Sequence, residues 1–218
     1  MQVESSVRSL DRRGKTITTF VIYDANAQLQ EMAEGEVLEV ITDEFAPFEP
    51  DISAWCQATG HVLLASERIP EAHRFLIEKR VPKVKETSVA MVISTDKLDE
   101  LLSPLGFALG AALEGMAVSL YFQGPAVRVL TKGFRPKLRG WGRPFSRFAA
   151  AGMSKTGHIP AQDKLRQLRS LGGRIYVCGG SMQPFKVRPE DLIFDDLAIV
   201  EYLTFAAVLE HADVQLYI

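Results

Sequence analysis

The 218-residue chain has only two cysteines, Cys56 and Cys178. They are too few and too far apart to form the disulfide framework of a small secreted domain. We therefore expect a cytoplasmic protein, because the N-terminus also lacks the apolar core of a signal peptide. The four histidines have no partner at metal-ligand spacing. Glycine-rich nucleotide motifs and the Gly-x-Ser-x-Gly elbow of hydrolases are absent too, so neither a cofactor nor a metal is expected.

A strong excess of charge is also missing. The formal net charge is −2, which speaks against a globally basic nucleic-acid-binding protein. One apolar run, residues 101–127, contains a single charged residue, Glu114, and is long enough to cross a bilayer. Pro104 and several glycines interrupt it, however, and Glu114-Gly115 has the character of a helix end. The run therefore predicts a buried helix followed by a buried parallel strand.

The first half of the chain predicts a small α+β domain of βαβαββ order. An i, i+4 spacing of apolar residues from Thr18 predicts a helix that stops at Gly35, and Asp51 is a suitable N-cap for a second helix, Ile52–Thr59. The predicted strands are Val7–Arg12, Glu36–Thr42, His61–Ser66 and His73–Lys79. We assign residues 1–81 to this domain and residues 82–88, which are charged and contain Pro82, to a linker.

Residues 89–218 alternate between strand and helix patterns, which favours a three-layer α/β domain with a parallel sheet. A long irregular region and a loop that ends at Pro189 interrupt the alternation. The predicted strands are Val89–Ser94, Met116–Gln123, Arg174–Cys178 and Val214–Ile218. The predicted helices are Leu98–Leu113, Ala161–Leu171 and Leu197–Glu210.

Cys178 is the main candidate for chemistry because it ends a predicted strand. Ligands of open parallel sheets bind beyond the carboxyl ends of the strands. The supporting residues in the sequence that follows would supply backbone N–H groups, a hydroxyl and positive charge, and so favour a thiolate; they are Gly179, Gly180, Ser181, Lys186 and Arg188. The alternative is a small buried core residue. Cys56, beside Trp55 on a predicted helix, is expected to serve packing.

A basic–aromatic segment, residues 128–155, is the third feature, because no acidic residue occurs between Glu114 and Asp163. Trp141, Phe145 and Phe148 lie among its charges. Such a mixture suits an anionic membrane surface, single-stranded nucleic acid or an acidic partner protein, and an oligomer interface or a mobile surface loop are the alternatives. The basic residues are Arg128, Lys132, Arg135, Lys137, Arg139, Arg143, Arg147 and Lys155.

Two families share motifs with this sequence. The segment GEVLEVITDEFAPFEPDISAWCQATGH, from Gly35 to His61, resembles TusA-type (SirA-like) sulfur carriers over about residues 5–80. Their Cys-Pro-x-Pro motif would open the first helix, but this chain has Thr18-Thr19-Phe20-Val21 there. The fold is implied for this domain, and the carrier chemistry is not.

Residues 88–218 resemble the DsrE/DsrF family of sulfur-relay proteins. The matching segments are SVAMVIS, FALGAALEGM, VSLYFQG and RIYVCGGSM, followed by Glu190-Asp191-Leu192. The resemblance implies that Cys178 holds a persulfide, that protein partners donate and accept the sulfur, and that copies form a homo-oligomer. The basic–aromatic segment is similar to an extended region of larger, membrane-associated members of that family.

We therefore predict a cytoplasmic sulfur-relay protein, peripheral to the membrane if the segment binds one, with no specific nucleic-acid partner. The alternative is a non-catalytic adaptor that binds a partner protein or an anionic membrane surface through the basic–aromatic segment.

Overall fold

The computed structural model describes residues 7–44, 48–81, 87–155 and 158–218. Its chain divides into two compact units, the first made mainly of residues 1–85 and the second of most of the chain from residue 86 onward. Most of the predicted linker, residues 82–86, lies outside the described residues. Ser88, which we assigned to the linker, already belongs to the first strand of the second unit.

The first unit has the predicted βαβαββ order. Its elements are β1 (Arg8–Asp11), α1 (Thr18–Gln30), β2 (Val37–Thr42), α2 (Phe48–Thr59), β3 (Val62–Ile69) and β4 (Ala72–Glu78). The sheet order is β1-β2-β4-β3, with β1 and β2 parallel and the other pairs antiparallel. Alternate residues of β2 are buried, as expected for a sheet with one face on a core. The prediction that Asp51 is the N-cap of this helix is wrong, because Asp51 lies within the first turn of α2. Its negative charge interacts favourably with the helix dipole there.

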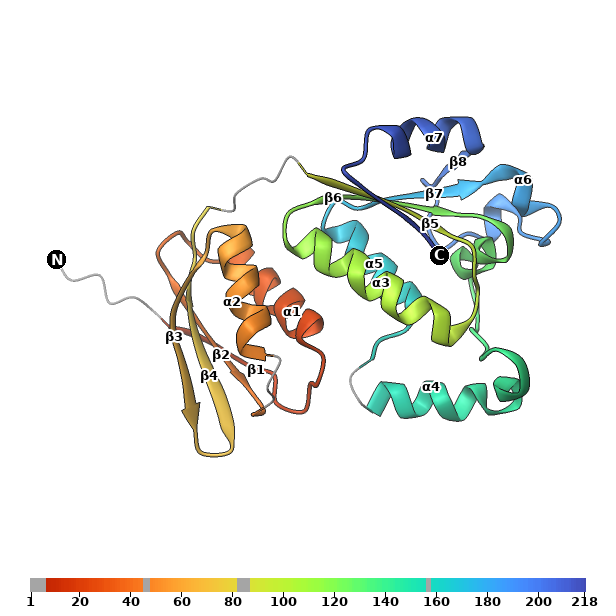
Figure 1. Ribbon diagram of the computed structural model, residues 1–218. Helices are drawn as coiled ribbons and strands as arrows, with labels where there is room; N and C mark the ends of the chain where they lie inside the picture. Colours follow the sequence, from red (N-terminus) through yellow and green to blue (C-terminus); the bar gives the residue numbers. More distant parts are fainter. Residues whose placement is uncertain (1–6, 45–47, 82–86, 156–157) are drawn as a thin grey trace. The chain divides into compact units, whose positions relative to one another are not determined.

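The second unit is built on a five-stranded, all-parallel sheet in the order β8-β7-β6-β5-β9. Helices α3 and α5 cover one face and α7 lies on the other (Figure 1). The strands are β5 (Ser88–Ile93), β6 (Ala117–Phe122), β7 (Arg174–Cys178), β8 (Ala198–Val200) and β9 (Val214–Tyr217). The longer helices of these layers are α3 (Leu98–Leu113), α5 (Ala161–Ser170) and α7 (Tyr202–Glu210). The three-layer parallel α/β architecture is confirmed.

The apolar run 101–127 forms most of α3 and then β6, as predicted. Gly115 takes a φ of 85° after α3, a conformation that glycine adopts without steric cost. Strand β6 is central and largely buried, which accounts for the continuous hydropathy. No helix in the described ranges is long and apolar enough to cross a membrane.

Three further predictions about local structure were wrong. The irregular region contains two 3-10 helices, η1 (Gly124–Leu130) and η2 (Gly140–Phe145), and an α-helix, α4 (Ser146–Lys155). The loop expected after Cys178 begins with the helical turn α6 (Gly179–Met182) and contains the 3-10 turn η3 (Pro189–Asp191). The predicted helix Leu197–Glu210 is divided into β8 and α7, because the apolar run 197–200 adds an edge strand to the sheet.

Lys164, on α5, is buried beneath α3, and its Nζ donates a hydrogen bond of 3.0 Å to the carbonyl oxygen of Leu102. Burial lowers the pKa of Lys164 to about 8. A lysine with a lowered pKa in the folded state costs stability while it is protonated. This cost is fully present below pH 8 and is lost as the pH rises toward the unfolded-state pKa.

We therefore expect Lys164→Met to be more stable than the parent protein at pH 7, and the difference to shrink as the pH rises from 8 to about 10.5. The change over that range is roughly 3 kcal/mol, measurable by denaturant unfolding at each pH. Lys137→Met, which replaces an exposed lysine, should show no such trend. If the free energies of unfolding of the parent and Lys164→Met changed in parallel with pH, the lowered pKa of Lys164 would be contradicted.

Candidate active site

Cys178 ends β7, where it lies beside Val200 of β8. Side chains alternate between the two faces of a strand, so Cys178 shares its face with Tyr176. Tyr176 contacts Phe205 of α7, with ring centroids 5.4 Å apart. Cys178 therefore lies on the face that α7 covers, and its exposed fraction is 0%.

Two tyrosine hydroxyls reach this sulfur from different elements. Tyr121 lies on β6 in register with Tyr176, and its ring stacks on Phe205 at 4.6 Å. Tyr202 is the first residue of α7 and approaches Tyr121 edge-on, with centroids 6.3 Å apart. Both phenols interact with Cys178. Tyr121 is buried, whereas Tyr202 is 61% exposed, so one donor is fixed in the core and the other faces outward.

Ser181 completes the surroundings of the thiol from α6. Its backbone and hydroxyl both interact with Cys178, and its Oγ also accepts a hydrogen bond of 2.9 Å from the backbone N–H of Gly124. The turn that follows β7 therefore returns a hydroxyl to the end of the strand. The hydroxyl of Ser181, which the sequence predicts to support the thiol, therefore lies beside the sulfur.

The acidity of the thiol results from two opposing effects. Burial raises the pKa of Cys178, but the nearby hydroxyls of Ser181, Tyr121 and Tyr202 favour the thiolate and outweigh this effect, so the pKa lies below its usual range. In return, the interaction with Cys178 raises the pKa of Tyr202. The site therefore holds protonated phenols against an activated sulfur.

Gly179 and Gly180 do not face an empty anion site. A Cβ atom on Gly179 would lie 2.8 Å from Oε1 of Glu201, and one on Gly180 would lie 3.3 Å from Oε2. The carboxylate of Glu201, which immediately precedes α7, thus lies against both glycines. The glycines permit this close approach, and Glu201 is a site residue that the sequence analysis missed.

The two basic residues expected near the thiol have other neighbours. Arg188 forms ion pairs with Asp191 at 2.9 Å and with Glu190 at 3.3 Å. Lys186 is exposed and has a φ of 56°. Both line a surface groove of about 640 Å³ that begins at Gly179, but the charge of Arg188 is already neutralised by its own acidic neighbours.

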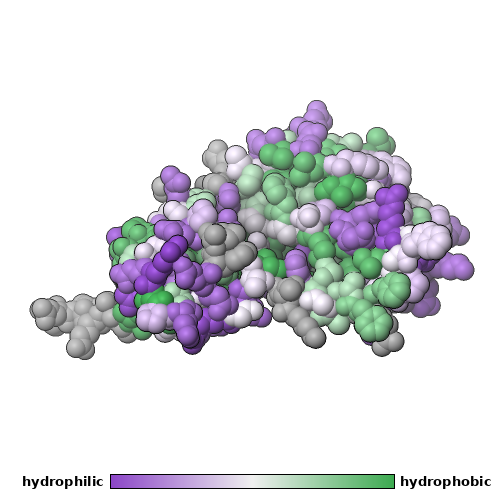
Figure 2. All heavy atoms as spheres, turned by 60° about the horizontal axis from the view of Figure 1, so that its bottom comes forward, coloured by the Kyte–Doolittle hydropathy of each residue, from purple (hydrophilic) through white to green (hydrophobic). Residues whose placement is uncertain are grey.

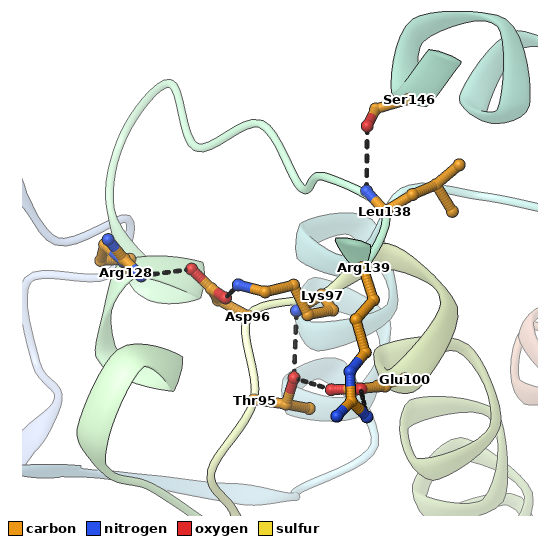
Figure 3. Close-up of polar contacts among 8 residues, drawn as sticks. All are labelled: Thr95, Asp96, Lys97, Glu100, Arg128, Leu138, Arg139 and Ser146. Carbon is orange, nitrogen blue, oxygen red and sulfur yellow. Dashed lines mark hydrogen bonds and ion pairs between the residues drawn. The ribbon is translucent and has the colours of Figure 1, made fainter. Parts of the chain in front are cut away.

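Part of the basic–aromatic segment is bound to the loop that follows β5 and to the first turn of α3 (Figure 3). Arg128 pairs with Asp96 at 2.6 Å, and Arg139 pairs with Glu100 at 3.2 Å. Lys132 donates a hydrogen bond of 3.0 Å to the carbonyl oxygen of Glu190. These three cations, which the sequence assigned to an anionic partner, hold the segment to its own unit.

The rest of the segment is open to solvent. Trp141 is 99% exposed, and Phe145 and Phe148 are also exposed. Apolar side chains gather over the region of α4 beside hydrophilic ones (Figure 2). In the described part of the segment, three exposed cations form no side-chain ion pair or hydrogen bond: Arg135, Lys137 and Arg143. The side chain of Arg147 lies outside the described part of the chain.

The first unit offers no comparable thiol among its described residues. Cys56 is buried in α2, and burial raises its pKa to about 12. Helix α1 begins at Thr18, where carriers of the TusA type would have their cysteine, and its N-cap residue Ile17 makes no side-chain cap. Cys56 therefore has the character of an inert core residue.

Comparison with known proteins agrees with this division of the chain. The family described as "Sulfurtransferase TusA" matches residues 21–79, and the DsrE/DsrF-like family matches residues 88–217. The chain belongs to the DsrE/DsrF-like family, with a TusA-like domain preceding it. Both are families of sulfur-relay proteins that exchange sulfur with partner proteins, which supports a role in sulfur transfer.

A solved structure, the YchN protein from E. coli, is similar with a TM-score of 0.44 and 13% identity, over 61% of this chain and 99% of that one. No curated protein matches the chain.

Proposed function

We propose that this chain is a sulfur-relay protein in which Cys178 accepts sulfane sulfur from a donor protein, holds it as a persulfide and passes it to an acceptor thiol. The observation that carries this proposal is the environment of the sulfur. A buried cysteine with no polar neighbours would have a raised pKa, as Cys56 has, whereas three hydroxyls lower the pKa of Cys178.

The transfer needs no external oxidant or reductant. The Cys178 thiolate attacks the terminal sulfur of a donor persulfide, a new S–S bond forms, and the donor S–S bond breaks. The donor sulfur leaves as a thiolate and takes up the proton of the transferred sulfhydryl. In the second half-reaction an acceptor thiolate attacks the terminal sulfur, and Cys178 is the leaving thiolate.

The test of this function is sulfur uptake. The protein is incubated with a cysteine desulfurase and free cysteine, and its intact mass is measured before and after reduction. We expect a gain of one sulfur atom that a reductant removes. A protein that takes up no sulfur from any donor would favour the adaptor function instead.

We also propose that the first unit is a docking or regulatory module, since its Cys-Pro-x-Pro motif is replaced by Thr18–Val21. The expected homo-oligomer is supported by α7, a fully described helix in which Phe205 is the one buried side chain and Leu203 is exposed. An apolar helix open on most of its faces is typical of a surface that another subunit covers.

A second function is favoured by the outward side of the basic–aromatic segment. The exposed rings of Trp141, Phe145 and Phe148 lie close in sequence to cations that no acid neutralises. Aromatic rings insert at a membrane interface, and each cation near an anionic leaflet contributes about 1 kcal/mol. We propose that this part of the segment binds an anionic membrane surface.

Retention on anionic liposomes tests this second function. Replacing the three cations of the segment that no acid neutralises by Gln is expected to abolish retention: Arg135, Lys137 and Arg143. The matched control removes three exposed cations elsewhere and is expected to remain bound: Lys15, Arg68 and Arg174. If the parent protein is not retained, or if both variants bind equally, the segment has no membrane function.

A further inference from the structure

The hydroxyl of Tyr121 is buried and, in the described part of the chain, has no hydrogen-bond partner of ordinary geometry. The residue is only 2% exposed. A buried hydroxyl without a partner costs roughly 1–3 kcal/mol, and folded proteins keep few of them. Phenylalanine would fill the same space without that cost, so the hydroxyl calls for a functional explanation.

The position of this hydroxyl is fixed by the packing of its ring. Tyr121 lies on β6 between β5 and β7, and its ring stacks on Phe205 with an interplanar angle of 12°. Because Tyr121 is in register with Tyr176, its side chain lies on the same face as Cys178, two residues further along β7. The sulfur of Cys178 is the group with which the phenol interacts.

We propose that Tyr121 is a catalytic residue of the sulfur relay, whose phenol donates a hydrogen bond to the sulfur of Cys178 whenever that sulfur is a thiolate. This inference rests on the proposed function and names a residue that acts in both half-reactions. In loading, Cys178 is the attacking thiolate. In unloading, it is the leaving thiolate. A neutral thiol is a weak acceptor, so the hydrogen bond strengthens as charge develops on the sulfur.

The other two hydroxyls are less suited to this part. The alcohol of Ser181 is a weaker acid than a phenol and therefore a weaker hydrogen-bond donor. Tyr202 is largely exposed at the start of α7, where water competes with the sulfur. Burial also raises the pKa of Tyr121, so its phenol stays protonated while the thiol ionises. Tyr121 therefore remains a hydrogen-bond donor and keeps its own proton.

The test compares Tyr121→Phe with Tyr176→Phe, a matched loss of a hydroxyl on the same face. The first measurement is the rate of alkylation of Cys178 as a function of pH, followed by mass spectrometry of its peptide. We expect the inflection to move to higher pH in Tyr121→Phe, with a roughly tenfold lower rate at neutral pH. We expect Tyr176→Phe to follow the parent profile.

The second measurement is thermal unfolding. Because the hydroxyl has no ordinary partner, Tyr121→Phe should be at least as stable as the parent protein. An unchanged pH profile in Tyr121→Phe would overturn the proposal, and so would a profile that moves equally in both variants. Neither result depends on sulfur uptake. A parent protein that takes up no sulfur rejects the proposed function, whereas normal uptake with an unchanged profile rejects only the role of Tyr121.

Discussion

Cys178→Ser is expected to lose all capacity to take up sulfur, since the serine hydroxyl forms no persulfide. The measurement is the intact mass after incubation with a cysteine desulfurase and free cysteine. A serine side chain is similar in size to cysteine and fits between Tyr121 and Ser181, the neighbours of Cys178, so the fold should persist. The effect is therefore expected to be complete and limited to the chemistry.

Cys56→Ser is the matched control because it removes the other cysteine. Cys56 is buried in α2 of the first unit, and its pKa of about 12 leaves almost no thiolate at neutral pH. The Cys56→Ser protein should still gain one sulfur atom. An adduct that survives Cys178→Ser and disappears in Cys56→Ser would place the sulfur chemistry on Cys56 in the first unit and contradict the proposal.

Phe205→Ala is expected to destabilise the second unit strongly. Phe205 is buried and packs against Tyr121 at 4.6 Å and Tyr176 at 5.4 Å. Truncation of a buried phenylalanine costs about 3–5 kcal/mol, which denaturant unfolding would measure. As the main contact of α7 with the sheet is lost, the start of α7 should release Tyr202 from Cys178.

Cys178 is buried on the face that α7 covers, so loosening this helix should open the sulfur to the reagent. The second expected result of Phe205→Ala is therefore faster alkylation of Cys178, under conditions in which the variant is still folded. The control is Thr204→Ala, an exposed neighbour on α7, which should change the free energy of unfolding by less than about 0.5 kcal/mol. Equal effects of the two substitutions would show that Phe205 does not hold α7 on the sheet.

Most elements of both sheets could be predicted from the sequence because their apolar patterns are strong and bounded by glycine. The strand that ends at Cys178 and the helix 98–113 have the predicted bounds. The split of residues 197–210 was missed because an edge strand and an apolar helix share one hydrophobic run. Residues 198–200 form a strand because they pair with β7, and this pairing between segments distant in sequence cannot be inferred from the local pattern.

Only some residues of the candidate site could be predicted from the sequence. Cys178 and Ser181 could be found because they follow one strand. Tyr121 lies 57 residues earlier in the chain than Cys178, and only the register of β6 with β7 brings them together. Arg188 shows the opposite error. Proximity in sequence suggested that it serves the thiol, although Glu190 and Asp191 nearby could have indicated its ion pairs.

The central claim, that Cys178 is a relay thiol, is tested most directly by following the labile sulfur to its peptide and out again. The loaded protein is treated with an acceptor thiol, and the peptides that contain Cys178 and Cys56 are analysed by mass spectrometry before and after transfer. We predict that only the Cys178 peptide carries the extra sulfur and that the acceptor thiol receives it. Sulfur on the Cys56 peptide, or sulfur that Cys178 does not release, would contradict the claim.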